Sequence, residues 1–143
     1  MNETSMNLRK DQFVIVVALL LAFLFLYTAF SKVLDPVGTL QALKNQVFPV
    51  WMAEILFYTL PIAEVSTTFL LMTDKWRIAG LKSSVVLMAI FTGYILLVLT
   101  GIFSRVPCSC GGVLNSLGWG EHLVFNLAVL GLAVLGVKMD QGK

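Results

Sequence analysis

The sequence predicts an all-α integral membrane protein, a four-helix bundle, and two observations carry that prediction. The first is composition: 58% of the 143 residues are hydrophobic and only 13% are charged, whereas a soluble domain is about a quarter charged and under half apolar. So short a chain cannot bury that much apolar surface in one core, so most of it must face lipid. The second is that the apolar residues gather in four stretches near the ~20 residues that a bilayer requires. These observations exclude a soluble enzyme and a disordered chain, and a net charge of +2 without a basic run excludes a nucleic-acid binder.

The first predicted span covers residues 13–34, and its uncharged part is Phe13–Phe30. It is longer than the apolar region of a signal peptide and lacks a small-residue cleavage site, so we expect a retained helix. Asp35 and Pro36 then supply turn chemistry. The segment that follows, up to Pro49, has the apolar spacing of an amphipathic stretch lying along the membrane interface.

Three further spans complete the predicted single membrane domain of residues 1–143. They cover residues 50–72, 78–103 and 119–137, and a short loop joins the second span to the third. The loop between the third and fourth spans, residues 104–118, contains the only two cysteines of the chain, Cys108 and Cys110. We therefore expect the reactive residues of the chain to lie in this loop.

The distribution of Lys and Arg residues predicts the orientation in the membrane. The termini and the loop between the second and third spans hold most of them: Arg9, Lys10, Lys75, Arg77, Lys82, Lys138 and Lys143. The opposite side holds only Lys32, Lys44 and Arg105. Positive residues favour the cytoplasm, so we expect both termini there. In a bacterial inner membrane the cysteine loop would then face the periplasm, where disulfides form and persist.

Cys108 and Cys110 have the spacing of a redox pair. Residues i and i+2 of an extended backbone project to the same side, so the two sulfurs can meet, but a bond between them would be strained. A strained, exposed disulfide exchanges readily, whereas so small a ring hardly constrains the unfolded chain. Pro107 stiffens the approach, and Gly111 with Gly112 leaves room for a partner sulfur. The pattern therefore favours thiol–disulfide exchange over a structural disulfide.

Two alternatives for the cysteine loop stay open. The thiols are idle, or they bind a soft ion such as Cu(I) together with His122 and Met52. His122 follows the loop near the start of the last span, where it can stabilise a thiolate, shuttle protons, or simply lie at the membrane surface. Trp119 has the position of an interfacial anchor.

Glu64 is the second candidate site, because a carboxylate near the middle of a span is costly in hydrocarbon and should face the bundle interior or the interface. Pro61, three residues earlier, frees a backbone carbonyl and leaves polar groups nearby. We expect a proton relay, a headgroup site such as that of a quinone, or a hydrogen-bonded packing residue. Asn126 on the last span is a candidate partner.

Several motifs resemble those of the MauE/DoxX-like family of small bacterial four-helix membrane proteins. They are Tyr27-Thr-Ala-Phe-Ser-Lys-Val-Leu-Asp35, Leu60-Pro-Ile-Ala-Glu64, Phe91-Thr-Gly-Tyr94 and Cys108-Ser-Cys-Gly-Gly112. The first two are shared with DoxX-type proteins generally, and the cysteine motif is similar to the MauE branch. The architecture is also similar to the vitamin K epoxide reductase and DsbB type of oxidase, which uses two cysteine pairs where this chain has one.

The resemblance implies a membrane protein that matures disulfide-rich periplasmic proteins with a thioredoxin-like partner, as in methylamine utilisation. Cys108 and Cys110 would then be the redox pair of a thiol–disulfide oxidoreductase or of an accessory to one. Two other functions stay open: a non-enzymatic scaffold or soft-metal-handling protein, and a DoxX-type subunit of a quinone-linked complex. Assembly as a homo-oligomer is also open.

Overall fold

The protein is described here by a computed structural model covering residues 2–102 and 118–142, in which all regular secondary structure is helical. The elements are α1 (Asn2–Leu34), α2 (Pro36–Lys44), α3 (Val50–Met72), the 3-10 helix η1 (Asp74–Trp76), α4 (Arg77–Leu99) and α5 (Trp119–Gln141). In the described part of the chain, α1, α3, η1 with α4, and α5 give four helical stretches long and apolar enough to cross a membrane. The prediction of an all-α membrane bundle is confirmed.

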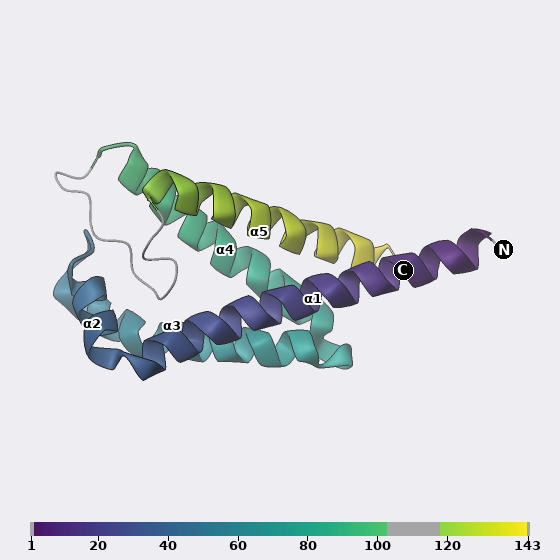
Figure 1. The fold of residues 1–143 in the computed structure, drawn as a ribbon, viewed down its shortest axis with the longest axis horizontal. Helices are drawn as coiled ribbons and strands as arrows, with labels where there is room; N and C mark the ends of the chain where they lie inside the picture. The colour runs from purple at the N-terminus through teal and green to yellow at the C-terminus, as the bar shows by residue number, and fades with distance from the viewer. Residues whose placement is uncertain (1, 103–117, 143) are drawn as a thin grey trace.

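The four long helices form a closed ring. Helix α1 packs against α3 and α5, α4 packs against the same two helices, and α1 and α4 lie diagonally opposite with little contact. Figure 1 shows both chain ends at one end of the bundle and α2 at the other. We call these the terminal end and the α2 end.

The helix bounds differ from the predicted spans mainly at α1 and α4. Helix α1 begins at Asn2 rather than near residue 13, and its exposed first turns project beyond the other helices at the terminal end. Helix α4 ends at Leu99, short of the predicted residue 103, and is followed by Gly101 at φ +73°. That left-handed conformation suits glycine after a helix end, because a side chain there would be strained.

Helix α2 occupies the stretch after α1. The Asp35 side chain accepts a hydrogen bond from the backbone N–H of Gly38 at 3.0 Å, and Pro36 occupies the first turn, so both residues favour a helix start here. Lys44, the last residue of α2, lies with its Nζ 3.9 Å from Oε1 of Glu54 on α3. Helix α2 therefore runs along α3 near the α2 end. Its location at the membrane interface stays a prediction.

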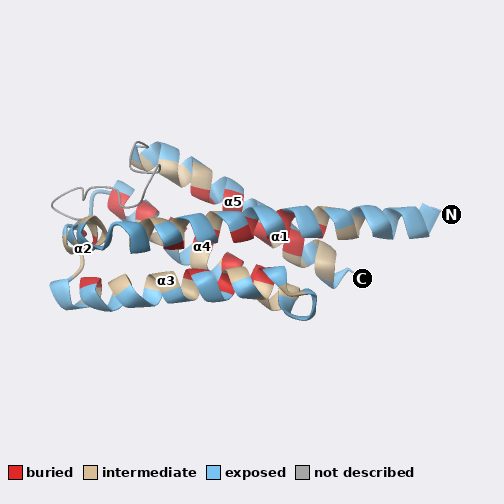
Figure 2. Ribbon diagram, turned by 60° about the horizontal axis from the view of Figure 1, so that its bottom comes forward, coloured by how far each residue is buried: buried red, intermediate tan, exposed pale blue. Residues whose placement is uncertain are grey.

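The apolar core lies toward the terminal end, where α1 contributes more buried side chains than any other helix. Figure 2 shows the buried residues on the faces that the long helices turn toward one another. The cluster consists of Val14, Val17, Ala18, Leu21, Ala22, Phe25, Leu71, Leu81, Met88, Val129 and Ala133. Helices α3 and α4 approach especially closely here, because a Cβ built on Gly80 would lie 2.6 Å from the backbone nitrogen of Leu71.

The outer faces of the helices are apolar as well. Phe23, Phe69 and Ile62 are 73%, 67% and 65% exposed. A monomeric soluble protein rarely exposes so much contiguous apolar surface, whereas lipid tails cover it at no cost.

Candidate functional site

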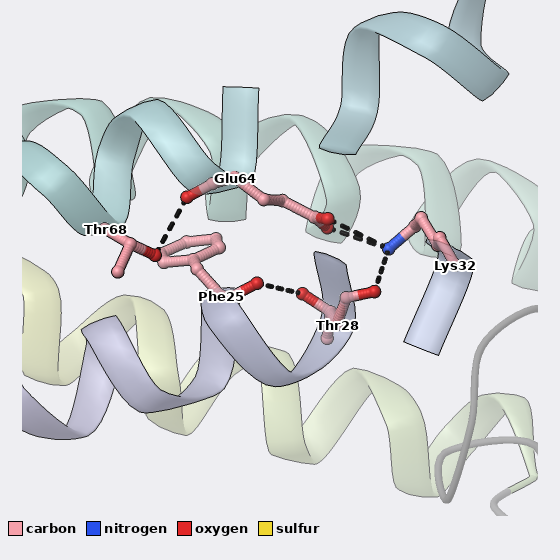
Figure 3. A network of polar contacts seen from close by, with 5 residues as sticks. All are labelled: Phe25, Thr28, Lys32, Glu64 and Thr68. Carbon is pink, nitrogen blue, oxygen red and sulfur yellow. Dashed lines mark hydrogen bonds and ion pairs between the residues drawn. The ribbon is translucent and has the colours of Figure 1, made fainter. Parts of the chain in front are cut away.

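Glu64 of α3 forms an ion pair with Lys32 of α1 inside the bundle (Figure 3). The Nζ of Lys32 lies 2.9 Å from Oε1 and 3.1 Å from Oε2 of Glu64. The same Nζ donates to the backbone carbonyl of Thr28 at 3.2 Å. An ammonium group has three N–H donors, so three acceptors within 3.2 Å satisfy all of them.

The two neighbouring threonines complete the polar network. Thr28 donates from its hydroxyl to the carbonyl of Phe25 at 3.0 Å, and Thr68 donates to the carbonyl of Glu64 at 2.9 Å (Figure 3). The Glu64 side chain is only 3% exposed and that of Lys32 is 16% exposed. A buried ion pair is tolerated when its remaining polar groups are satisfied, and here they are. The arrangement ties α1 to α3.

The pair corrects two interpretations of the sequence. The carboxylate for which Asn126 of α5 was a candidate partner instead bonds Lys32 of α1 with both oxygens. Lys32 was counted among the residues on the side of the cysteine loop, but its ammonium bonds a residue that lies about 21 Å along α3 from Val50. Lys32 therefore belongs to the interior of the bundle.

A groove of about 290 Å³ runs beside the ion pair. Its walls combine the end of α1, the start of α2 and the middle of α3: Lys32, Val33, Pro36, Phe57, Tyr58, Pro61 and Ile62. Lys32 is the one charged side chain among them, and its three N–H groups already have acceptors. The groove can therefore hold an apolar ligand. Lys32 has no N–H left to donate to the carbonyl of a quinone.

A second polar contact lies at the α2 end. The Tyr94 hydroxyl of α4 bonds Oε1 of Gln46 at 2.7 Å, and Gln46 is 1% exposed in the segment between α2 and α3. The Tyr94 ring also lies 6.1 Å from the ring of Phe48 and 6.4 Å from that of Trp119, in tilted and edge-on geometries. Such ring pairs stabilise a fold by more than the burial of their apolar area alone. Tyr94 thus joins the α2–α3 connection to the first residue of α5.

His122 lies in the first turn of α5. The N–H of His122 bonds the carbonyl of Gly118 at 2.9 Å, the first bond of the helix. The Glu121 carboxylate accepts from the N–H of Gly118 at 3.2 Å, which is one half of a capping box, and Gly118 has no side chain to supply the other half. The Nδ1 atom of His122 is buried and has no hydrogen-bond partner among the described residues. No hydrogen bond or ion pair within residues 2–102 and 118–142 links His122 to Glu64. His122 and Glu64 therefore do not form one site.

Cys108 and Cys110 lie outside the described residues, so their predicted pairing stays a prediction. The structure does describe where the chain leaves and returns: α4 ends, and α5 begins with Trp119, at the α2 end. Within the described part of the chain, no group of three or more His, Cys, Asp or Glu side chains is arranged to hold a metal ion.

Lys32, Gln46 and Tyr94 are polar residues whose contacts the sequence reasoning missed. Lys32 closes an apolar stretch, and Glu64 interrupts another, so two opposite charges at span positions were the available signal. Gln46 and Tyr94 are 48 positions apart, and no spacing rule predicts that contact. Both the Lys32 motif and the Glu64 motif had indicated a family, and the ion pair brings these two motifs together.

The comparisons with known proteins connect the chain with one described family. The family model described as methylamine utilisation protein MauE matches residues 10–139, nearly the whole chain. No curated protein and no solved structure matches the chain. The matched region includes the Lys32–Glu64 pair, the Tyr94 contacts and the cysteine segment.

Proposed function

The chain belongs to the MauE family, and from that premise we propose that it is a bacterial inner-membrane protein whose Cys108–Cys110 pair exchanges disulfides with a periplasmic thioredoxin-like partner. The description of the family links it to methylamine utilisation, and the four apolar helices fit a multi-pass membrane protein. The exchange supports the maturation of disulfide-containing periplasmic proteins.

The exchange is balanced without any further reactant. A partner thiolate attacks one sulfur of the Cys108–Cys110 disulfide, that S–S bond breaks, and a mixed disulfide forms. The second partner thiolate then attacks the mixed disulfide and releases both cysteines as thiols. The partner loses two electrons and two protons, and the cysteine pair gains them. In the reverse direction, the second cysteine of the chain resolves the mixed disulfide.

One observation carries the proposal: the segment with the only two thiols is attached at the end of the bundle opposite both termini (Figure 1). Such an arrangement separates the thiols from the side on which the termini lie. It is what a protein needs if its termini are cytoplasmic and its thiols act in an oxidising compartment.

The described cations support the orientation. The terminal end holds Arg9, Lys10, Lys75, Arg77, Lys82 and Lys138 near the outer turns of its helices. With Lys32 inside the bundle, Lys44 is the described cation at the α2 end, and it faces Glu54. Removing Lys32 from the count strengthens the asymmetry on which the positive-inside rule operates.

The direct test is to capture the mixed disulfide. Cys108→Ala and Cys110→Ala each leave one thiol, which can form the mixed disulfide but cannot resolve it. We expect at least one of these variants to migrate on a non-reducing gel as an adduct with a thioredoxin-like protein, and the adduct to disappear on reduction. The variant lacking both cysteines is the matched control and should capture nothing.

Two outcomes contradict the proposal. The exchange is wrong if neither single variant captures a partner and the wild-type pair stays reduced outside the cytoplasm. A reporter fused after Lys143 that is active only in the periplasm inverts the orientation and removes the redox argument. Stoichiometric copper on the purified protein, lost with either cysteine variant, would instead support the metal-handling alternative.

A further inference from the structure

A crevice at the terminal end has one charged wall and otherwise apolar walls. Its volume is about 50 Å³, and its lining consists of Ile15, Ala18, Leu19, Leu71, Met72 and Arg77. Ile15, Leu19 and Met72 are 41%, 50% and 58% exposed, so this crevice opens on the lipid-facing side of α1 and α3. It thus has an apolar approach and a cationic end.

The guanidinium of Arg77 is only partly satisfied. Its Nη2 bonds the carboxylate of Asp74, while its Nε is buried and has no hydrogen-bond partner among the described residues. The Arg77 side chain is 18% exposed, whereas that of Asp74 is 90% exposed. A buried N–H without an acceptor is costly, so a group that brings an acceptor into the crevice would be stabilised.

We propose that this crevice binds an anionic phospholipid. The lipid phosphate accepts hydrogen bonds from Arg77, and the upper part of an acyl chain packs on Ile15, Leu19 and Met72. Arginine suits this role because its planar donors match phosphate oxygens. An ordered water would also satisfy Nε, but it would leave the apolar walls unused.

Neighbouring residues favour a negatively charged headgroup over a zwitterionic one. Lys75 and Lys82 are exposed on either side of Arg77 in the chain, and each adds an attraction for anionic lipid. Trp76 is 50% exposed, and the Nζ of Lys75 lies 5.7 Å from the centre of its ring. A half-exposed tryptophan beside cations is typical of the headgroup level of a membrane.

The inference does not depend on the proposed thiol exchange or on the orientation of the chain. It concerns the other end of the bundle and a purified protein can test it, so failure of one proposal leaves the other untouched.

The test begins with the full-length wild-type protein in detergent. It is mixed with equimolar phosphatidylglycerol and phosphatidylcholine with identical acyl chains, and the lipids retained on the intact protein are counted by native mass spectrometry. We expect one phosphatidylglycerol to be retained in preference, with about tenfold selectivity, because both lipids carry the phosphate but only phosphatidylcholine adds a positive charge beside Arg77, Lys75 and Lys82. Equal retention of the two lipids overturns the proposal.

Matched variants then distinguish a site from diffuse charge. Arg77→Gln and Lys82→Gln each remove one positive charge from α4, but only the first alters the crevice. We expect Arg77→Gln to lose the retained phosphatidylglycerol, because its phosphate loses the guanidinium donors. Lys82→Gln should keep the lipid, with at most a reduced preference over phosphatidylcholine. Equal losses in the two variants would mean that general attraction holds the lipid, and the proposal would be wrong. If Arg77→Gln does not fold, Arg77→Lys serves instead, because it retains the charge but loses the planar donors. Unchanged retention of phosphatidylglycerol in that variant then contradicts the proposal.

Discussion

The two ends of the bundle are held together by different forces. Toward the terminal end, apolar side chains such as Leu21, Leu71 and Leu81 are at most 2% exposed, and Gly80 lets two helices touch. From the middle of the bundle to the α2 end, polar contacts accompany this packing: the Lys32–Glu64 ion pair in the interior and the Tyr94–Gln46 hydrogen bond at the α2 end. The first kind of contact depends on shape and tolerates apolar residues of similar volume, whereas the second requires particular partners.

This difference suggests that the two kinds of contact have different roles in the bundle. A polar pair inside a membrane protein is costly unless every donor and acceptor is matched, so it fixes the helices in one arrangement. The Tyr94–Gln46 hydrogen bond lies at the end that carries the cysteine segment, and the ion pair lies farther inside the bundle. We infer that the polar contacts fix the relative positions of the helices to which the proposed redox segment is attached. The following substitutions test the contrast between the two ends.

The largest effect is expected at the ion pair. Glu64→Leu leaves the Lys32 ammonium without its carboxylate partner inside the bundle, which should cost about 3–5 kcal/mol. The measurement is the midpoint of thermal unfolding of the purified protein in detergent. The double variant Lys32→Met with Glu64→Leu should regain most of the loss, because no charge is then left buried. A double variant as unstable as the single one would show that the pair does not act as a unit.

A smaller effect is expected where α3 and α4 touch. In Gly80→Ala, the new methyl group would meet the backbone of Leu71 at 2.6 Å, so the helices must separate, at a cost of about 1–3 kcal/mol. Gly93→Ala on the same helix is the control, because nothing lies within 4 Å of the added Cβ. It should be neutral or stabilise the helix by up to about 1 kcal/mol. Equal unfolding midpoints for the two variants would contradict the close packing.

The Tyr94 hydrogen bond should contribute less. Tyr94→Phe keeps the ring beside Phe48 and Trp119 but removes the donor to Gln46, and one such bond contributes about 1 kcal/mol. Tyr94→Leu also removes the ring contacts and should destabilise further. If both variants unfold at the wild-type midpoint, the polar contact at this end does not contribute to stability.

The smallest effect is expected for the exposed pair. Lys44 and Glu54 lie 3.9 Å apart, with side chains 39% and 60% exposed, so Lys44→Ala should change stability by no more than about 0.5 kcal/mol. A loss comparable to that of Glu64→Leu would mean that burial does not distinguish the two ion pairs. Raising the salt concentration provides a second check, since screening should remove the small contribution.

The sequence was sufficient for the fold class because four apolar stretches can satisfy their backbone polar groups in lipid only as helices. It also predicted that Glu64 faces the interior or the interface, and the 2% exposure places it in the interior. The identity of its partner was beyond the sequence, because Lys32, Asn126 and Glu64 lie on different helices, and only the packing of α1 on α3 selects between them.

The Tyr94–Gln46 contact illustrates the same limit. Gln46 lies in a short polar connection, and nothing in its neighbours predicts that it is buried against a tyrosine of α4. For His122, the sequence predicted a place near the start of the last helix, and the structure adds a buried Nδ1 without a partner among the described residues. The cysteine pair lies outside those residues, so the chemistry proposed for it still depends on spacing and family.

The measurement that tests the central claim most directly is alkylation of the two cysteines in intact spheroplasts with a membrane-impermeant thiol reagent. Because Cys108 and Cys110 are the only cysteines of the chain, any label on the isolated protein reports on this pair. The account predicts no labelling before reduction, and labelling of both cysteines after treatment with an impermeant reductant. Labelling without any reduction, or labelling that requires permeabilised membranes, would contradict it.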